Sequence, residues 1–467
     1  MGVVCCVDFG STFTKAALVD LETGELVGTA SHLTTIDTDV LDGWDAIRVE
    51  LRGLAGAADV PVRACSSAGG GLRICVVGNE ELVTAEAGRR VALSSGGRVV
   101  HVSSYDVDLA AVRDSAPDVV LLVGGTDSGN ADVLLRNARA LAKARWRGPV
   151  VLAGNTDATR EISGLFDAGP VPFVVADNVV PRIGVLRPDS ARSAIREMFL
   201  AHVIGGKQLS KRADFAAMVK GATPDVVLTA AELLSRGIGP NRPGAGDVVV
   251  VDVGGATTDV HSVVDIDPED AGLARQVVAA VPVSRTVEGD LGMRWSAVPT
   301  VDAAAGAGLD LSAELVAAAR ARRADPGLVP DSPGEVAFDL QIASAAVRLA
   351  VRRHAGRQQV VFGPGGRLVE RSGKDLREVD LVVGSGGVLR HNASSEALGV
   401  IAAGTGADVE GGWLVPRDPT VVIDHEGVLA AAGLLAADHP SAAYRLLASH
   451  LLPLLSLSPR EESQMHP

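Results

Sequence analysis

The sequence has few cysteines, and their arrangement excludes the common cysteine-based sites. The four cysteines form no C-x-x-C pair; they are Cys5, Cys6, Cys65 and Cys75. Cys5 and Cys6 are neighbours in an apolar strand pattern, where adjacent side chains point to opposite faces and do not readily ligate one tetrahedral metal ion. We therefore expect all four to be small buried hydrophobic residues in a reducing cytoplasm.

Long hydrophobic runs and targeting signals are also missing. The longest apolar stretches, Val248–Val251 and Val428–Ala437, are far shorter than the ~20 residues that span a bilayer. The opening MGVVCCVDFG has no basic segment and no small-residue cleavage site, so it does not resemble a signal peptide. Position 6 is Cys, whereas a myristoylation signal needs Ser or Thr there. The sequence predicts a cytoplasmic protein that has no membrane partner.

A dense basic surface is absent as well. Lys and Arg number 43 against 57 Asp and Glu, which gives a formal net charge of −14. No dense run of Lys and Arg occurs, whereas a protein that binds a duplex normally needs a basic face to neutralise phosphates. We therefore expect no nucleic-acid partner.

What the sequence has is length and a high apolar content. Its 467 residues, 47% of them hydrophobic, are too many for one ordinary core, so two domains or a split architecture is expected. Residues 3–8, 16–20 and 21–28 indicate three antiparallel strands joined by tight turns, and residues 59–77 indicate two more around a glycine-rich bend. From about residue 98 to 205, apolar strands alternate with helices over short loops, which favours an inserted parallel βαβ unit.

The best boundary between domains is the glycine- and proline-rich segment GIGPNRPGAG, residues 237–246. We expect a first lobe over residues 1–240 that contains the βαβ unit, a second lobe over residues 241–402, and a final segment over residues 403–467. The last residues of the chain, SPREESQMHP, have the composition of a disordered tail. A helix that begins near residue 189 has Ser190 as its candidate cap.

Three segments share one pattern, in which an apolar strand ends in a turn of small or hydroxyl-bearing residues. They are residues 8–15, DFGSTFTK; residues 252–259, DVGGATTD; and residues 384–387, GSGG. The first two begin with Asp and stand about 244 residues apart, and the third follows about 130 residues later. One such turn is often an ordinary hairpin, whereas two copies followed by a glycine loop indicate a shared site.

This pattern fits the binding of a nucleoside triphosphate with Mg²⁺. Turns of Gly, Ser and Thr let backbone N–H groups approach a polyanion closely, and hydroxyl groups add further donors. A carboxylate at a strand end can hold Mg²⁺ through its waters, because this ion keeps most of its water shell. Two facing turns would hold the β- and γ-phosphates from both sides, and the third loop would leave room for the base or ribose.

In this order and over most of the chain, the three segments resemble the actin, sugar-kinase and heat-shock-70 ATPase superfamily. Residues 8–15 resemble its first phosphate motif, residues 252–259 its second, and residues 381–387 its adenosine motif. The resemblance implies an α/β fold of two lobes, built from duplicated ribonuclease H-like domains that close around Mg-ATP. It also implies that a helix at residues 427–437 crosses back to the first lobe.

Further segments resemble a narrower family. SSAGGGLRICVVG, VLLVGGTDSGN, ADNVVPRIGVL, RTVEGDLGMR and GSGGVLRH are similar to the MutL family associated with glutamate mutase, which is unrelated to the mismatch-repair protein. This resemblance implies an ATPase that reactivates or chaperones an adenosylcobalamin-dependent mutase of the glutamate mutase or aminomutase type. The implied cofactors are ATP and Mg²⁺, and the implied partner is a mutase subunit.

The resemblance also implies roles for individual residues. Asp8 and Asp252 would organise Mg²⁺, and Asp259 would position the attacking water or support the turn. Glu232, which lies 20 residues before Asp252, is a further candidate carboxylate, with a solvated helix face as the alternative. The residues implied in contacts with phosphates or adenosine are Gly10, Ser11, Thr12, Lys15, Gly254, Gly255, Thr257, Thr258, Gly384, Ser385, Gly386 and Gly387.

The segment VEGDLGM, residues 287–293, is a candidate for closing over the nucleotide. Glu288 and Asp290 would support that loop from behind. The alternative is a simple turn in which Asp290 caps a helix.

Polar residues also end three strands of the predicted βαβ unit, where parallel sheets place ligands. The first strand ends in GGTDSGN, residues 124–130, whose Thr126, Asp127 and Asn130 are candidate ligand contacts, and Asn155 and Asn178 end the next two. We expect these strand ends to share a crevice. For Asp127 or Ser128, however, we favour a role as a helix cap.

Other functions use the same fold and remain alternatives. A small-molecule kinase needs a carboxylate base beside the acceptor hydroxyl, for which Asp127 or Asp157 is available. An electron-donating activator ATPase needs cysteine-held iron–sulfur clusters, which the cysteine pattern does not support. A scaffold without catalysis is disfavoured because both motif aspartates are present. We therefore favour the reactivating ATPase over the kinase.

Overall fold

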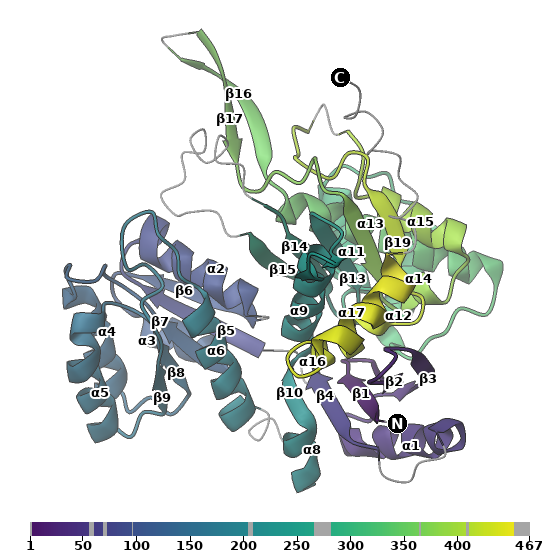
Figure 1. Ribbon diagram of the computed structural model, residues 1–467. Helices are drawn as coiled ribbons and strands as arrows, with labels where there is room; N and C mark the ends of the chain where they lie inside the picture. The colour runs from purple at the N-terminus through teal and green to yellow at the C-terminus, as the bar shows by residue number, and fades with distance from the viewer. Residues whose placement is uncertain are drawn as a thin grey trace, which may run out of the picture.

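The computed structural model describes residues 2–55, 60–68, 72–95, 97–203, 209–265, 282–363, 366–407 and 411–452. Three five-stranded sheets and the helices that cover them make up these residues (Figure 1). The tail predicted to be disordered lies outside the described residues.

The first sheet combines an antiparallel meander with two parallel strands, in the order β10-β4-β1-β2-β3. β1 and β2 pair antiparallel, as do β2 and β3, whereas β4 runs parallel to both β1 and β10. The strands are β1 (Val3–Phe9), β2 (Phe13–Asp20), β3 (Leu26–Leu33), β4 (Val62–Ser66) and β10 (Val219–Ala222). The predicted three-stranded antiparallel start is therefore confirmed.

The second sheet repeats this plan, in the order β15-β14-β13-β18-β19. β13, β14 and β15 form the antiparallel meander, while β18 runs parallel to both β13 and β19. The strands are β13 (Val248–Val253), β14 (Thr258–Val263), β15 (Val283–Glu288), β18 (Leu381–Ser385) and β19 (Thr420–Ile423). Because both sheets read 3-2-1-4-5 in order of appearance, the predicted duplicated α/β fold with two lobes is confirmed.

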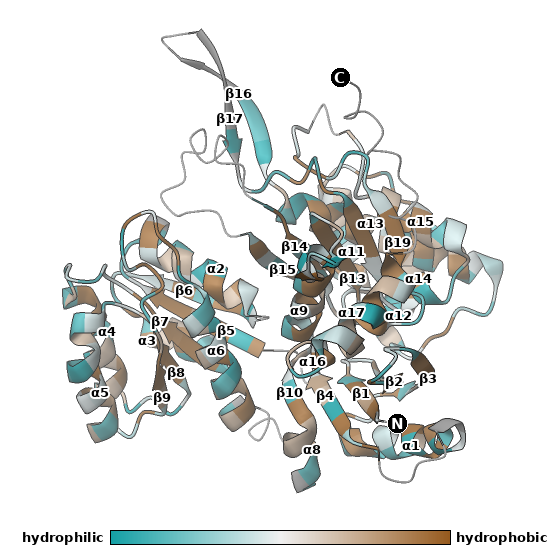
Figure 2. Ribbon diagram, in the orientation of Figure 1, coloured by the Kyte–Doolittle hydropathy of each residue, from teal (hydrophilic) through white to brown (hydrophobic). Residues whose placement is uncertain are grey.

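The equivalent strands β1 and β13 each separate two hydrophobic cores. Cys5 faces helix α1 (Val40–Ala55) of the first lobe, whereas Cys6 faces α9 (Thr223–Arg236) and α16 (Val428–Leu435), which lie between the two sheets. On β13, Val249 faces the helices of the second lobe and Val250 faces α9 and α16. All four cysteines are buried and free, as predicted. Figure 2 shows the resulting band of hydrophobic strands and helices in the interior.

The third sheet is inserted between β4 and β10 and is entirely parallel, in the order β6-β5-β7-β8-β9. Its strands are β5 (Leu72–Gly78), β6 (Gly97–Ser104), β7 (Val119–Leu122), β8 (Val150–Leu152) and β9 (Phe173–Val175). Helices α4 and α5 cover one face, and α2 and α6 cover the other. The strand order 2-1-3-4-5 is that of a doubly wound sheet, whose ligands lie at the carboxyl ends of the strands.

Two local predictions differ from the structure in this region. The two strands predicted around the glycine-rich bend are present, but the second of them, β5, belongs to the inserted sheet, which therefore begins before the predicted bound of about residue 98. Ser190 does not cap α6, whose cap position is Pro188, because its hydroxyl instead accepts a hydrogen bond from the Asp177 N–H at 3.0 Å.

The helices complete both lobes. They are α1 (Val40–Ala55), η1 (Glu81–Ala85), α2 (Glu86–Ser94), α3 (Leu109–Asp114), α4 (Asp132–Lys143), η2 (Thr156–Ala158), α5 (Thr159–Ala168), α6 (Asp189–Met198), η3 (Phe199–Val203), α8 (Ala213–Met218), α9 (Thr223–Arg236), α11 (Ala297–Gly306), α12 (Ala313–Ala324), α13 (Pro333–His354), α14 (Gly387–Arg390), α15 (Ser394–Ala402), α16 (Val428–Leu435) and α17 (Pro440–Leu451). Two small antiparallel hairpins join β11 (Gly237–Gly239) to β12 (Arg242–Pro243) and β16 (Arg357–Gly363) to β17 (Gly366–Ser372). In the described part of the chain, no helix has the length and apolar character needed to cross a bilayer.

Candidate functional site

The turns of the two equivalent hairpins have the same construction. In the first, the Gly10 N–H donates to the Phe13 carbonyl at 3.1 Å; in the second, the Gly254 N–H donates to the Thr257 carbonyl at 2.8 Å. A Cβ atom at either glycine would lie 2.6 Å or 2.9 Å from that carbonyl oxygen, so both turns need glycine for the same close approach.

The two turns face each other across the lobes. A Cβ atom at Gly255 of the second turn would lie 2.5 Å from the Thr12 hydroxyl of the first. That hydroxyl is buried and has no hydrogen-bond partner in the part of the chain that the structure describes. Asp8 and Asp252 end the strands before these turns and lie close enough that Asp252 raises the pKa of Asp8. The structure therefore brings together the two turns that the sequence singled out.

Asp8 lies in a network that reaches three strands. The Thr223 hydroxyl donates to its carboxylate at 2.5 Å, and the Cys65 thiol donates more weakly at 3.6 Å. Burial raises the pKa of Asp8, while Lys15, its partner across the hairpin, and the Thr223 hydroxyl act to lower it. Cys65 is thus more than the hydrophobic filler that we expected.

The same position carries opposite charge in the two hairpins. Lys15 stands opposite Asp8, whereas Asp259 stands opposite Asp252. Asp259 accepts a hydrogen bond from buried Arg285 at 3.1 Å. Burial raises the pKa of Asp259, the Arg285 guanidinium lowers it, and Asp252 raises it further. Asp252 and Asp259 therefore form a carboxylate pair that Arg285 partly neutralises.

Other predicted phosphate contacts differ in placement. Ser11, Thr257, Gly254 and Gly255 lie in or next to the turns. Thr258, by contrast, directly follows the second turn as the first residue of β14, and it is fully buried opposite Val253. Its hydroxyl has no hydrogen-bond partner among the described residues.

The segment after β15 lies directly on the second turn. The N–H groups of Met293 and Arg294 donate to the carbonyls of Gly254 and Gly255 at 3.0 and 2.8 Å. Glu288 and Asp290 support this loop through Arg353, which contacts them at 2.8 and 2.7 Å. Asp290 does not cap a helix among the described residues, because the next helix, α11, begins after Ser296.

The third motif meets the second hairpin at the end of β18. Ser385 is the register partner of Asp252, and a Cβ atom at Gly386 would collide with the Val253 carbonyl. Gly387 begins α14. Burial lowers the pKa of His391, which follows this helix, and the charges of Arg390 and of Lys15 in the first lobe lower it further. Gly384 instead faces Ile401 and Ile423 in the core, where a Cβ atom would lie 2.8 Å from each side chain, so its glycine serves packing.

Glu232 is the one predicted carboxylate that the structure keeps apart from this site. It lies nine residues beyond Thr223 on α9, which is about 13 Å of helix rise. Its carboxylate pairs with Arg192 of α6 at 3.1 Å. This carboxylate therefore helps to fasten α6 to α9.

The comparisons with known proteins agree with this picture. The family described as MutL protein matches residues 4–451. Protein MutL of Clostridium tetanomorphum is 36% identical over 463 residues, which cover 97% of this chain and 100% of that protein. The chain belongs to the MutL protein family.

Solved structures align over most of this MutL-family chain but superpose loosely. The activator of the 2-hydroxyisocaproyl-CoA dehydratase from Clostridium difficile covers 94% of this chain and 95% of its own, at 10% identity and a TM-score of 0.32. Ethanolamine utilization protein EutJ from Carboxydothermus hydrogenoformans covers 95% and 89%, at 11% identity and a TM-score of 0.28. The fold of the MutL-family chain is therefore assigned from its own strand order.

Several site residues of the MutL-family chain escaped the sequence reasoning. Thr34 donates to the Gly10 carbonyl at 2.8 Å and so supports the first turn. Thr223 donates to Asp8, and Arg285 donates to Asp259. The only available signal was the Thr-Pro pair at the start of α9, which is typical of a helix beginning. It did not indicate proximity to Asp8, because β10 lies two strands away from β1.

Under the ATPase activity that the resemblance implies, Thr223→Val is expected to lower kcat for ATP hydrolysis about tenfold, because Asp8 loses a hydrogen bond that fixes its orientation. Thr229→Val is the matched control, since Thr229 lies on the same helix but, among the described residues, its hydroxyl bonds the Asp225 carbonyl. Steady-state phosphate release by both variants checks the prediction. Equal rates for the two variants would show that Thr223 has no role in the site.

Substitutions at two glycines of the third motif are expected to distinguish a role in packing from a role in ATP binding. Gly384→Val should lower the melting temperature, because overpacking against Ile401 and Ile423 costs about 1–3 kcal/mol, yet leave ATP affinity unchanged. Gly386→Ala should weaken ATP binding, because Gly386 has φ +116° and lies against Val253 beside the second turn. Thermal melts and titration calorimetry measure both effects. A loss of ATP affinity in Gly384→Val would contradict the packing role.

The polar strand ends of the inserted sheet also lie together. Asn178 donates to the Gly125 carbonyl at 3.0 Å and to Asp127 at 2.9 Å, and Asp127 also accepts from Thr156. Ala131 is the cap position of α4, so the favoured capping role of Asp127 or Ser128 is wrong. Asp157 accepts from the Ser128 N–H at 3.1 Å. Both candidate kinase bases are thus occupied in holding this loop.

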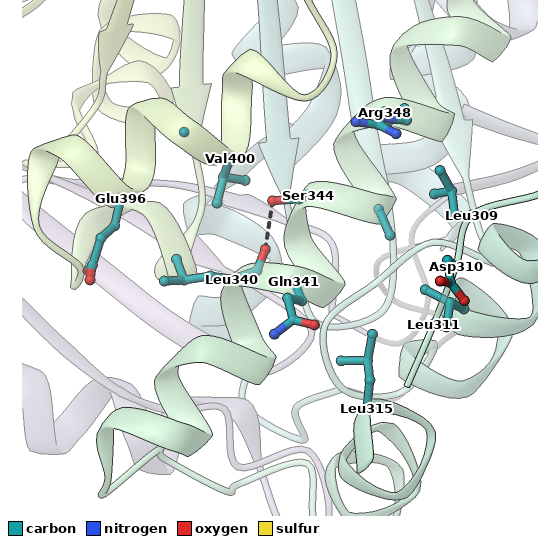
Figure 3. A pocket seen from close by; sticks show the side chains of 12 residues that line it. Leu309, Asp310, Leu311, Leu315, Leu340, Gln341, Ser344, Arg348, Glu396 and Val400 are labelled. Atoms are coloured by element: carbon teal, nitrogen blue, oxygen red, sulfur yellow. Dashed lines mark hydrogen bonds between the residues drawn. The ribbon is translucent and has the colours of Figure 1, made fainter. Parts of the chain in front are cut away.

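A cavity of about 470 Å³ lies in the second lobe, away from the predicted motifs. Figure 3 shows it between α13, α15 and the loop before α12, with Leu309, Leu311 and Leu340 on its apolar walls and Arg348 and Glu396 at its edges. None of the residues predicted for nucleotide binding lines it.

Proposed function

We propose that the protein binds Mg-ATP between the two hairpin turns and hydrolyses it. The observation that carries the proposal is the contact between equivalent turns, each closed by the same hydrogen bond and each preceded by an aspartate. Among the described residues, no group of three or more His, Cys, Asp or Glu side chains forms a metal site. A pair of carboxylates suits Mg²⁺, which commonly takes one or two plus phosphate oxygens and waters.

The chain's own residues fit this ligand. Asp8 and Asp252 would hold the ion, and Ser11, Thr12 and Lys15 would face the phosphates from the first lobe. The buried Thr12 hydroxyl is a donor that finds no acceptor within the described ranges, as a phosphate contact requires. When bound, Mg-ATP supplies the free energy of phosphoryl transfer. Asp259, oriented by Arg285, would position the attacking water.

Calorimetric titration with ATP and ADP, with and without Mg²⁺, tests this step. We expect binding of both nucleotides, and we expect chelation of Mg²⁺ to abolish hydrolysis. Absence of ATP binding to the purified protein would overturn the site assignment.

We further propose that ATP turnover reactivates an adenosylcobalamin-dependent mutase of the glutamate mutase or aminomutase type. Support comes from membership in the MutL family and from a contact between the loop after β15 and the inserted sheet. The Arg98 guanidinium of β6 packs on Gly289, 2.9 Å from where a Cβ atom would stand. The loop that contains Gly289 also bonds the second turn, so separation of the lobes would move or break this contact.

Such a contact gives the inserted sheet a means of responding to nucleotide. A partner can be released or bound only if its affinity differs between the nucleotide states. The test is a mutase inactivated with hydroxocobalamin and then supplied with adenosylcobalamin, ATP and this protein. We expect activity to return with the wild-type chain and to stay absent with Asp8→Asn. Recovery without ATP would contradict an ATP-driven role.

The kinase alternative has less support from the contacts. Asp127 and Asp157, the two candidate bases, are engaged within the inserted sheet. A phosphoryl-transfer screen on hydroxylated small molecules distinguishes the two functions, since the proposed reactivating factor transfers phosphate only to water.

A further inference from the structure

The segment after β9 contains a large apolar side chain that is unusually exposed to solvent. Ile183 has 77% of its surface accessible, which is the highest value for a large hydrophobic residue in the described ranges. It stands in a tight turn in which the Val185 N–H donates to the Arg182 carbonyl at 3.0 Å. The third residue, Gly184, has φ +78°, as a type II turn requires. Val185, the last residue of this turn, is also exposed.

This turn is firmly attached to the inserted sheet. Val179 and Val180 at its base are buried, and the Arg187 N–H closes it by donating to the Val179 carbonyl at 2.9 Å. The Pro181 carbonyl accepts from the Asp127 N–H at 3.1 Å, which ties the turn to the loop after β7. Ile183 is therefore presented on a fixed support, so little conformational entropy would be lost when a partner covers it.

Charge and position indicate what could cover it. Arg182 and Arg187, both exposed, flank the apolar tip, although the whole chain carries a net charge of −14. The turn also lies at the carboxyl ends of the inserted strands, the edge at which doubly wound sheets receive their ligands. A rigid Ile with neighbouring Arg side chains is the kind of anchor that fills a pocket at the centre of a protein interface.

We propose that residues 182–187, the docking tip, insert into a partner protein at an apolar pocket rimmed by Asp and Glu side chains. Under the function proposed above, on which this inference rests, that partner is the mutase subunit. Two arginines and one isoleucine are too few for stable attachment to a bilayer or a duplex, and the acidic chain would be repelled by either surface.

The test measures binding of purified glutamate mutase holoenzyme to the full-length wild-type chain and to three variants. We expect Ile183→Asp to weaken binding about 100-fold, the scale of losing a central anchor. Arg182→Glu should slow association about tenfold and reduce its salt dependence, as loss of a charge at the rim does. Val329→Asp is the matched control, because Val329 is 72% exposed on the second lobe, and it should bind like wild type.

The outcomes separate this inference from the proposed function. Equal binding by wild type and Ile183→Asp would overturn the docking tip while leaving the mutase as partner. Failure of the wild-type chain to bind the mutase with ATP, with ADP or without nucleotide would overturn the proposed partner, and with it this inference. Binding to anionic phosphatidylserine vesicles that Ile183→Asp abolishes would replace the protein partner by a lipid surface. Unchanged ATP affinity in Ile183→Asp would confirm that the variant is folded.

Discussion

Replacing Asp8 by Asn is expected to lower kcat for ATP hydrolysis by about 100-fold or more, the scale of losing a charge-organising group in an active site. Asp8 lies at the contact between the lobes, close to Asp252 and hydrogen-bonded by Thr223 and Cys65. Asn keeps the shape but removes the charge that Mg²⁺ needs. Because burial raises the pKa of Asp8 and so disfavours its carboxylate, the variant should melt no lower than wild type.

Phosphate-release kinetics and thermal melts, both with Mg²⁺, measure these two effects. Asp37→Asn is the matched control, because Asp37 is exposed beyond the same hairpin. Asp252→Asn should cause a similar loss, and the double variant should lose little more, because residues that act on one ion are not additive. An Asp8→Asn enzyme that keeps more than roughly a tenth of wild-type activity would contradict the metal role.

Replacing Asp339 by Leu is expected to cause the largest loss of stability, about 3–5 kcal/mol, because it removes the carboxylate that fully buried Arg322 and half-buried Arg294 share, while Arg322 keeps Glu335. Asp339 accepts from Arg322, which is fully buried, at 2.5 Å, and from Arg294 at 3.2 and 2.9 Å. Arg294 in turn bonds the Gly255 carbonyl through its N–H. The same change should therefore also weaken ATP binding.

Differential scanning calorimetry should record a fall of about 10 °C in the melting transition of the second lobe, at 2–4 °C per kcal/mol for a unit of this size. Asp302→Leu on α11 is the control, because Asp302 is exposed. An unchanged transition in Asp339→Leu would mean that other groups compensate the two arginines.

Local patterns were sufficient wherever one strand and its turn determine the structure. The Val-rich runs, the glycine turns and the aspartates predicted both hairpins, because period-two alternation and tight-turn residues act within a few positions of the chain. The resemblance of the repeated pattern to the actin, sugar-kinase and heat-shock-70 superfamily then implied the duplicated lobes. The misplacement of β5 has the opposite cause. Its pairing with β7 depends on residues more than forty positions away, which no local pattern encodes.

The same distinction explains the site residues that were missed. Thr223 reaches Asp8 only because β10 lies parallel to β4. Glu232 has a helical setting that the sequence could indicate, but its pairing with Arg192 depends on how α6 meets α9. Thr258 and Gly384 looked like turn residues, yet their position in the register directs them into the core.

The sequence by itself therefore determined the two aspartate hairpins and the glycine loop, because these depend on short-range backbone preferences and hydrophobic alternation. Its resemblance to a known superfamily indicated the two-lobed α/β class. Tertiary structure alone decided that Thr12 meets Gly255, that Arg285 holds Asp259 and that Arg98 packs on Gly289. Each of these contacts joins residues from different elements. Their formation depends on packing across whole sheets, whose free energy no single segment contains.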